Sequence, residues 1–374
     1  MDYNKLIYNL YYEWWKNIDK FIFSLIILLF ITGLFFSLVS TSLLVSDKLD
    51  TNDYAFFFKH LSFVALGIMI IFILSSINED KLFKISPIIF LFSLISLFLV
   101  PIIGVEVNSA QRWIDLYFLP RFQPIELVKP FLIVLISLIL SSEKYTNIYF
   151  KYLSSFFITL IIALLLAAQP DIGQTLLVFF SWSVLIFISG INIIFLTISC
   201  LIITVALIFL IKFVPKFEYI KNRISSFFNS ETGTHNAQSE KAIDSITSGG
   251  YFGKGIGEGT LKNRVPEAHT DYIISVISEE FGVIAIILIL MLFLIFIYSV
   301  FKKVYQENNE RTKLILVGCA SLILVQAMIH IGVNIRLFPT TGMTLPFISY
   351  GGSSIISISI LSGIILNLTK RKIN

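Results

Sequence analysis

The sequence predicts an all-α integral membrane protein with about ten transmembrane helices and a large extracytoplasmic loop between the seventh and eighth helices. Hydrophobic residues make up 56% of the chain, charged residues only 14%, and the mean hydropathy is +0.86. An ordinary soluble domain carries about 25% charged residues. The apolar residues form runs close to the ~20 residues that a bilayer-spanning helix needs, and one polar connection, residues 215–270, interrupts them. We therefore expect residues 1–374 to form a single polytopic membrane domain.

The apolar runs divide the chain into ten spans. No small-residue cleavage site follows the first run, which favours an uncleaved span over a signal peptide. The fifth, sixth and seventh spans are almost continuous, and only the reversals at 169–171 and 190–192 separate them. The expected spans are residues 21–44, 60–77, 86–104, 125–141, 152–168, 172–190, 192–214, 271–300, 312–335 and 345–369.

The positive charge of the loops predicts the orientation. Ten spans place both termini on one side, where the segments contain 14 Lys and Arg residues, against 6 in the short loops of the opposite side. Because cytoplasmic loops carry the excess of Lys and Arg, both termini are expected in the cytoplasm. The 215–270 loop then faces outward.

Net charge and cysteine usage argue against a nucleic-acid-binding protein and against a disulfide, zinc or redox site. The net charge of +4 is small and scattered among loops, which argues against a nucleic-acid partner and suits contact with membrane lipid. The two cysteines, Cys200 and Cys319, lie in apolar runs without the spacing of a zinc or redox motif. No disulfide is expected.

Ionisable residues are concentrated where the 215–270 loop meets the eighth span: Glu267, His269, Asp271, Glu279 and Glu280. In a helix that starts near residue 270, the last two glutamates lie roughly 12–14 Å beyond Asp271 at 1.5 Å per residue. Ionisable groups at such a depth usually face a water-filled cavity or a partner. We interpret this stretch as a functional site.

The segment just before that stretch, residues 248–259, is rich in glycine. Six glycines in eleven residues allow positive φ angles and close backbone approach to a ligand. As a phosphate-binding motif the signal is weak, because no strand precedes it and no Lys-Ser/Thr follows at P-loop spacing. A flexible outward-facing loop is the alternative.

A second constellation surrounds the start of the fourth span. Pro124 suits a first helical position, which places Glu126 and Lys129 three residues apart on one helix face. They form either part of a site or an interfacial ion pair with a snorkelling lysine. Arg112 and Arg121, next to aromatic residues, can bind a phosphate or a lipid headgroup.

Two other segments leave alternatives open. Asp171 follows a proline, and a plain helix N-cap is the commoner role for aspartate there. Residues 334–354 contain two prolines, three glycines and six serines or threonines, which predicts a broken or re-entrant start of the last helix. Such backbone is tolerated only inside protein or beside a cavity; a small-residue helix-packing face is the other interpretation.

Several motifs together resemble the SEDS family over almost the whole chain. The ten expected helices and the large external loop before the eighth occur in the same order in that family. One departure is Ile125, where the family usually has serine. The matching motifs are Gln-Arg-Trp (111–113), Gln-Pro-Ile-Glu-Leu-Val-Lys (123–129), Gln-Pro-Asp-Ile-Gly (169–173), Pro-Glu-Ala-His-Thr-Asp (266–271), Glu-Glu-Phe-Gly (279–282) and Pro-Thr-Thr-Gly-Met-Thr-Leu-Pro-Phe-Ile-Ser-Tyr-Gly-Gly-Ser-Ser (339–354).

The resemblance implies a peptidoglycan glycosyltransferase that polymerises lipid II together with a class B penicillin-binding protein. The motifs at 266–271 and 341–346 are more similar to the division members (FtsW) than to the elongation members (RodA), which implies divisome partners and a division-site location in the bacterial inner membrane. It also implies that Asp271 is catalytic. The substrate-binding candidates that fall in the motifs are Arg112, Glu126, Lys129, Asp171, Glu267, His269, Ser349 and Ser353; Arg121 joins them as a cation at the bilayer surface.

The residues fit this chemistry on independent grounds. The reaction needs a base for a sugar hydroxyl, and Asp271 is the candidate. Desolvation at the bilayer surface favours its neutral acid form, whereas the start of its own helix favours the carboxylate. Arg112, Lys129 and Arg121 are the cations available for a diphosphate leaving group. A divalent cation, Mg²⁺ or Mn²⁺, is chemically reasonable there, but no ligand cluster specifies one.

Two other functional classes are alternatives to a glycosyltransferase. A lipid flippase predicts inverted repeats and a path open to both faces; no clear repeat is visible, and the polar groups lie toward the outer face. A purely structural division scaffold predicts that Asp271 is replaceable without loss.

Overall fold

The computed structural model describes residues 12–41, 54–107, 110–115, 120–143, 147–228, 234–261, 268 and 270–370. Within them, seven helices are long and apolar enough to cross a membrane, and three more, α6, α8 and α15, have 17 residues each. The chain is a multi-pass, all-helical membrane protein, as the sequence predicts. The ten helices are α2 (Lys20–Thr41), α4 (Ala55–Ser76), α5 (Glu79–Ile103), α6 (Pro124–Leu140), α7 (Ile148–Ala168), α8 (Ile172–Ile188), α9 (Ile193–Phe213), α13 (Ile273–Gln306), α14 (Glu310–Asn334) and α15 (Gly352–Leu368).

Two helices begin before the apolar runs because asparagine side chains cap them. Asn78 and Asn147 each accept a hydrogen bond from the amide two residues further on. Helices α5 and α7 therefore start several residues before the spans expected at 86 and 152. An N-cap of this kind stabilises a helix by about 1 kcal/mol.

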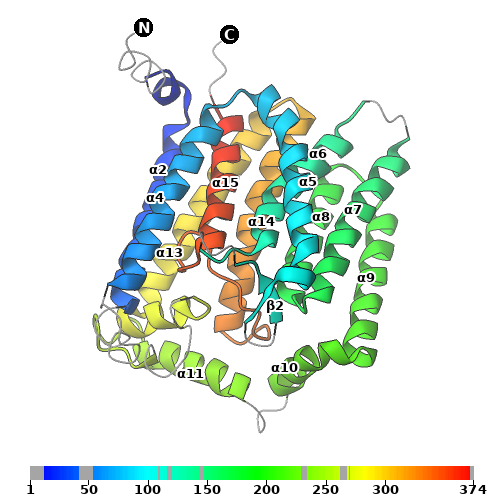
Figure 1. The fold of residues 1–374 in the computed structure, drawn as a ribbon. Helices are drawn as coiled ribbons and strands as arrows, with labels where there is room; N and C mark the ends of the chain where they lie inside the picture. Colours follow the sequence, from blue (N-terminus) through cyan, green and yellow to red (C-terminus); the bar gives the residue numbers. More distant parts are fainter. Residues whose placement is uncertain are drawn as a thin grey trace.

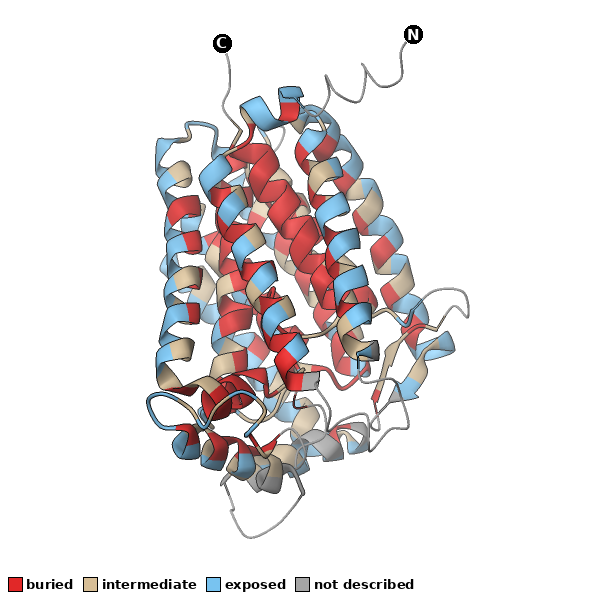
Figure 2. Ribbon diagram, turned by 90° about the vertical axis from the view of Figure 1, so that its left-hand side faces the viewer, coloured by how far each residue is buried: buried red, intermediate tan, exposed pale blue. Residues whose placement is uncertain are grey.

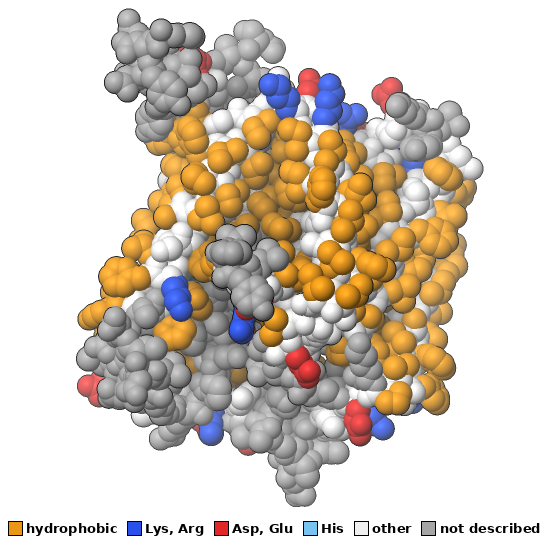
Figure 3. Space-filling model, viewed as in Figure 1, with side chains coloured by type: hydrophobic (Ala, Val, Ile, Leu, Met, Phe, Trp, Pro, Cys, Tyr) orange, Lys and Arg blue, Asp and Glu red, His pale blue; other side chains and the backbone are white. Residues whose placement is uncertain are grey.

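The elements divide between the two ends of the bundle (Figure 1). Helix α2 begins and α15 ends at one end, whereas α10 (Glu218–Phe228) and α11 (Thr234–Gly249) lie across the other. A hairpin of β1 (Val105–Val107) and β2 (Ala110–Trp113), which the sequence analysis did not predict, lies at the same end as α10. Hydrophobic side chains cover the middle of the face in Figure 3, and most charged side chains on it lie toward the two ends. This distribution suits a bilayer-spanning protein.

Helix α15 is the most deeply buried helix of the bundle. Buried residues lie toward the bundle centre and exposed residues on its outer faces (Figure 2). A methyl group on Gly67 of α4 would lie 2.3 Å from the Ser359 hydroxyl, so small residues set the close approach of the two helices. The connection at 335–351 is not helical and α15 starts at Gly352 rather than near 345. The broken start therefore occurs, and within the 334–354 segment a methyl group on Gly352 would clash with the Phe63 ring of α4, so a small residue sets the packing there too.

The glycine-rich segment that follows α11 supports a kink in α13. The kink lies at Gly282, with φ of 78° and ψ of 177°. There the amide of Lys254 donates to the carbonyl oxygen of Glu279 at 2.9 Å, and a methyl group on Gly253 would lie 2.2 Å from the carbonyl oxygen of Glu280. Gly253 thus permits close approach of the segment to another part of the chain.

Glu279 joins α13 to residues 254–261 through hydrogen bonds. Its carboxylate accepts hydrogen bonds from Lys254 Nζ at 2.9 Å, from the amides of Thr260 and Leu261 at 3.0 and 2.9 Å, and from the Thr260 hydroxyl at 3.1 Å. The side chain is buried. Glu279 thus has its partner in the preceding segment of the chain, and it anchors that segment to α13.

Candidate active site

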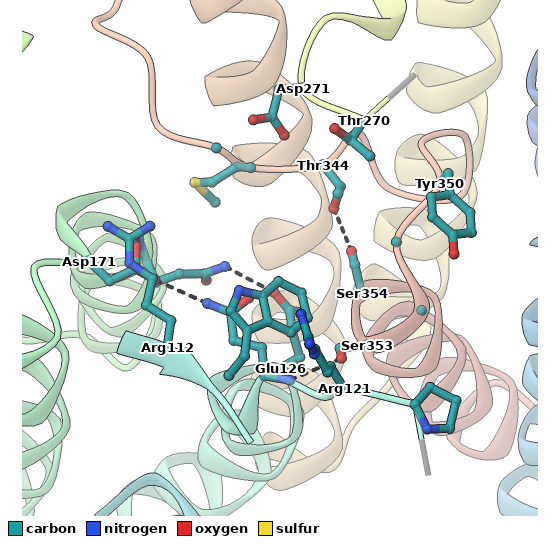
Figure 4. A pocket seen from close by; sticks show the side chains of 18 of the residues that line it. Arg112, Arg121, Glu126, Asp171, Thr270, Asp271, Thr344, Tyr350, Ser353 and Ser354 are labelled. Atoms are coloured by element: carbon teal, nitrogen blue, oxygen red, sulfur yellow. Dashed lines mark hydrogen bonds and ion pairs between the residues drawn. The ribbon is translucent and has the colours of Figure 1, made fainter. Parts of the chain in front are cut away.

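A cavity of about 790 Å³ lies at the end of the bundle that carries α10 and the hairpin. Its walls come from α4, β2, α6, α8, α10 and the segments that precede α13 and α15. Pockets that hold a whole small ligand measure about 300–1,000 Å³. The lining side chains are largely polar or charged (Figure 4), and they come from segments far apart in the sequence.

Asp271 lines this cavity from a short turn just before α13. Its backbone is held from behind: Asn334 Nδ2 donates to the Asp271 carbonyl oxygen at 3.0 Å, and the Ser349 hydroxyl donates to the carbonyl oxygen of Thr270 at 2.7 Å. Asn334 Oδ1 in turn accepts from the amide and hydroxyl of Ser275 at 3.2 and 2.9 Å. The turn is therefore fixed through its main chain, with the carboxylate at the cavity wall.

One face of α14 fixes both sides of the cavity. Gln326, His330 and Asn334 follow each other at intervals of four residues, which places them on one helix face. Gln326 Nε2 donates to the Thr344 carbonyl oxygen at 3.0 Å, and His330 Nδ1 donates to the carbonyl oxygen of Met343 at 2.7 Å. Because Asn334 holds Asp271, α14 sets the position of Asp271 relative to the facing 342–344 segment.

A buried ion pair forms the floor. Lys129 Nζ lies 2.8 Å from Glu126 Oε1, and Gln174 Nε2 donates to the same oxygen at 2.9 Å. Lys129 also donates to Gln326 Oε1 at 3.4 Å. Glu126 lines the cavity, but the fully buried Lys129 does not. The predicted Glu126–Lys129 ion pair is therefore present and borders the cavity through Glu126, whereas Lys129 is buried rather than snorkelling and is the counter-ion of Glu126.

Arg112 and Asp171 form one side wall. Arg112 Nε lies 3.6 Å from Asp171 Oδ2, and the guanidinium also donates to the carbonyl oxygens of Gln169 and Pro170. Asp171 accepts from Gln123 Nε2 at 3.1 Å and from the amide of Gln174 at 3.3 Å. Asp171 is thus the N-cap of α8 and, at the same time, the residue that orients Arg112.

Three further cations line the cavity: Arg121, Lys59 and Arg223. Arg121 is largely exposed and pairs with Asp115 at 2.9 Å. Arg223 extends from α10, and its Nη1 donates to the Thr340 carbonyl oxygen at 3.1 Å. The cluster suits a strongly anionic ligand such as a diphosphate.

Hydroxyl groups occupy the wall formed by the start of α15. Ser353 lines the cavity and accepts from the amide of Gln123 at 3.0 Å. The Thr344 hydroxyl donates to that of Ser354 at 2.6 Å. Ser349 does not line the cavity; it supports the Asp271 turn from behind. Burial raises the pKa of Tyr350, so its hydroxyl stays protonated and available as a donor.

Two remaining expectations concern the residues Glu267 and His269 and a bound metal ion. Glu267 and His269 lie outside the described residues. Across the described part of the chain, no three His, Cys, Asp or Glu side chains are grouped so that they could hold a metal ion.

Sequence reasoning missed Lys59, Arg223, Gln326 and Asn334. The two α14 residues had a readable signal, because polar side chains four residues apart in an apolar run mark a buried polar face. Lys59 and Arg223 had none, since only the packing of α4 and α10 brings them to the cavity.

Comparisons with known proteins agree on one family. The FtsW/RodA/SpoVE family model, described as cell cycle protein, matches residues 19–374. Similar proteins include the probable peptidoglycan glycosyltransferases FtsW of Enterococcus hirae (33% identity over 96% of this chain and 94% of that protein) and of Caulobacter vibrioides (30%, 96% and 91%). A chain of a solved peptidoglycan synthase complex has the same fold, with a TM-score of 0.77 at 24% identity over 94% of this chain and 97% of that one.

Proposed function

Because the chain belongs to the FtsW/RodA/SpoVE family, we propose that it is a peptidoglycan glycosyltransferase that polymerises lipid II on the outer face of the bacterial cytoplasmic membrane. The observation that carries the proposal is a carboxylate, Asp271, that shares one cavity with Arg112, Arg121, Arg223 and Lys59. Glycosyl transfer from a diphosphate needs both a base and a cluster of cations.

The reaction follows from these positions. Asp271 accepts the proton of a sugar hydroxyl on one substrate, and the hydroxyl oxygen forms a bond to the anomeric carbon of the other. The bond between that carbon and the diphosphate oxygen breaks, and its electron pair leaves on undecaprenyl diphosphate. Arg112 and its neighbouring cations stabilise that charge. Asp171 orients Arg112, since it contacts the guanidinium at 3.6 Å.

The buried pair Glu126–Lys129 has a positioning role in this scheme. It joins α6 to α8 through Gln174 and to α14 through Gln326. The pair therefore links the helix that begins next to Arg112 with the helix that holds Asp271. A fixed floor keeps the base and the cations at constant separation, which proximity catalysis requires.

The more specific assignments rest on the relatives. The FtsW names of the similar proteins support a role in septal synthesis with divisome proteins, and the solved synthase complex supports a class B penicillin-binding partner. The loop-charge bias supports cytoplasmic termini, and α10 and α11 lie at the end opposite the start of α2. An elongation role is the alternative, because the family model spans both kinds of protein.

The test is lipid II polymerisation by the purified protein with its penicillin-binding partner. Asp271→Asn keeps size and hydrogen bonding but removes the base, and Asp244→Asn, at an exposed position of α11, is the matched control. We expect glycan strands from wild type and the control, and polymerisation at least about a hundredfold slower from Asp271→Asn. Polymerisation by Asp271→Asn at the wild-type rate would overturn the role of Asp271. Transbilayer movement of lipid II without any polymerisation would instead support a flippase.

A further inference from the structure

A second, smaller pocket adjoins the cavity between α8, α10 and the segment that follows α14. It measures about 170 Å³, and we call it the side slot. Arg112 and Arg223 line both the cavity and the side slot. The two spaces therefore meet at a pair of guanidinium groups.

The remaining wall of the side slot is largely apolar. It includes Leu176 of α8, Ile224 of α10, and Ile329 and Phe338 beside the end of α14. Leu176 and Phe338 are 47% and 48% exposed. Because α8 begins at the cavity end, Leu176 lies only about one helical turn inside it. The slot thus leads from exposed apolar side chains near the cavity end of α8 to the arginines.

The size and charge of the side slot select a class of ligand. A volume of 170 Å³ is below the ~300 Å³ at which pockets hold whole ligands, so the slot suits one segment of a larger molecule. The described residues that line it include two arginines and no acidic side chain, although Asp171 contacts Arg112 from the cavity side. An apolar chain with an anionic head matches both features.

We propose that the side slot holds the first isoprenoid units of a polyprenyl diphosphate, with its diphosphate between Arg112 and Arg223. The inference rests on the proposed function, because polymerisation joins two lipid-linked molecules and both lipid anchors must reach one cavity. The side slot houses the anchor of one of them and leaves the larger cavity to the sugars. Arg223 then binds the diphosphate from α10 and also ties α10 to Thr340.

Photocrosslinking tests binding without requiring polymerisation. The photoreactive substitutions are Leu176→benzoylphenylalanine and, as a matched control, Phe180→benzoylphenylalanine, one turn further along α8 and 54% exposed. We expect radiolabelled undecaprenyl diphosphate to label position 176 at least fivefold more than position 180 and Arg223→Gln to abolish the difference. Unlabelled undecaprenyl diphosphate should compete, whereas undecaprenol and phosphatidylglycerol should not. Equal labelling of the two positions, or equal competition by phosphatidylglycerol, would overturn the proposal.

A variant that fills the side slot tests whether the slot contributes to the polymerisation rate. Leu176→Trp should lower the rate at limiting lipid II by about tenfold, mainly through KM, because it displaces a few buried methylene groups; Phe180→Trp should not. Unchanged kinetics of Leu176→Trp would refute the slot even if wild type polymerises normally. Selective labelling at 176 without any polymerisation would uphold the slot and count against the proposed function.

Discussion

Two carboxylates near the start of α13, Asp271 and Glu279, lie about two helical turns apart and are held in opposite ways. Glu279 is buried, and four hydrogen bonds from the glycine-rich segment and its neighbours reach its carboxylate. At Asp271 the support comes through the main chain, from Asn334, while the side chain lines the cavity. The contrast shows that depth in the membrane does not by itself mark a candidate base: the Glu279 side chain is buried against the preceding segment, whereas the Asp271 side chain lines the cavity.

The buried pair beneath the cavity gives the largest expected loss of stability. Lys129→Met leaves the Glu126 charge without its counter-ion at 2.8 Å, which costs about 3–5 kcal/mol. Thermal unfolding in detergent measures it. The double variant Glu126→Gln/Lys129→Met is the control and should regain most of the Tm; if the double variant is as unstable as the single one, the charge explanation is wrong.

Glu279→Gln tests whether Glu279 stabilises the fold rather than taking part in the reaction. The substitution weakens charge-assisted hydrogen bonds that join the glycine-rich segment to the kink, so we expect a loss of about 1.5–3 kcal/mol. The folded fraction should keep its polymerisation rate. Unfolding curves and rates per folded molecule separate the two effects, and a folded, stable variant with a much lower rate would place Glu279 in the active site after all.

Asn334→Ala tests the main-chain support of Asp271. The variant leaves the carboxylate in place but removes the hydrogen bond of 3.0 Å to its carbonyl oxygen. Misplacement of a catalytic group by about 1 Å costs up to 10²-fold, so kcat should fall about 10- to 100-fold with little change in KM. Ser321→Ala, about three and a half turns before Asn334 on α14, is the control. Equal kcat values for both variants would show that the support is dispensable.

Asp19 lies at the other end of the bundle, and its substitution should have the smallest effect on stability. Its carboxylate lies 2.8 Å from Lys303 Nζ. Burial alone would raise the pKa of Asp19, but hydrogen bonds from Lys303 and the amides of Ile22 and Phe21 outweigh it and lower the pKa. The pair therefore stabilises the fold above the ordinary aspartate pKa and loses its effect as the pH falls below about 4. We expect Asp19→Asn to cost about 0–1 kcal/mol at pH 7, measured as ΔTm, and nothing in acid; a constant ΔTm at all pH values would contradict this.

The sequence predicts the helices well because the bilayer sets their length, and polar reversals such as Gln169-Pro170-Asp171 stand out in apolar runs. It does not predict what each buried charge contacts. The partner of Glu279 comes from the preceding glycine-rich segment, and that contact depends on the kink at Gly282. Lys129 does not snorkel because its ammonium is buried between Glu126 and Gln326, and the packing of α14 supplies Gln326. Motif resemblance located Asp271, whereas Arg223 became a candidate only through the packing of α10.

The most direct test of this contrast is one experiment on Asp271→Asn and Glu279→Gln side by side, with lipid II polymerisation and thermal unfolding measured on the same purified complexes. We predict that Asp271→Asn loses about 10²- to 10⁴-fold in rate, as expected for a missing general base, with an unchanged Tm. Glu279→Gln should show the reverse, a lower Tm with a wild-type rate per folded molecule. A fully active Asp271→Asn, or a stable but inactive Glu279→Gln, would contradict the account.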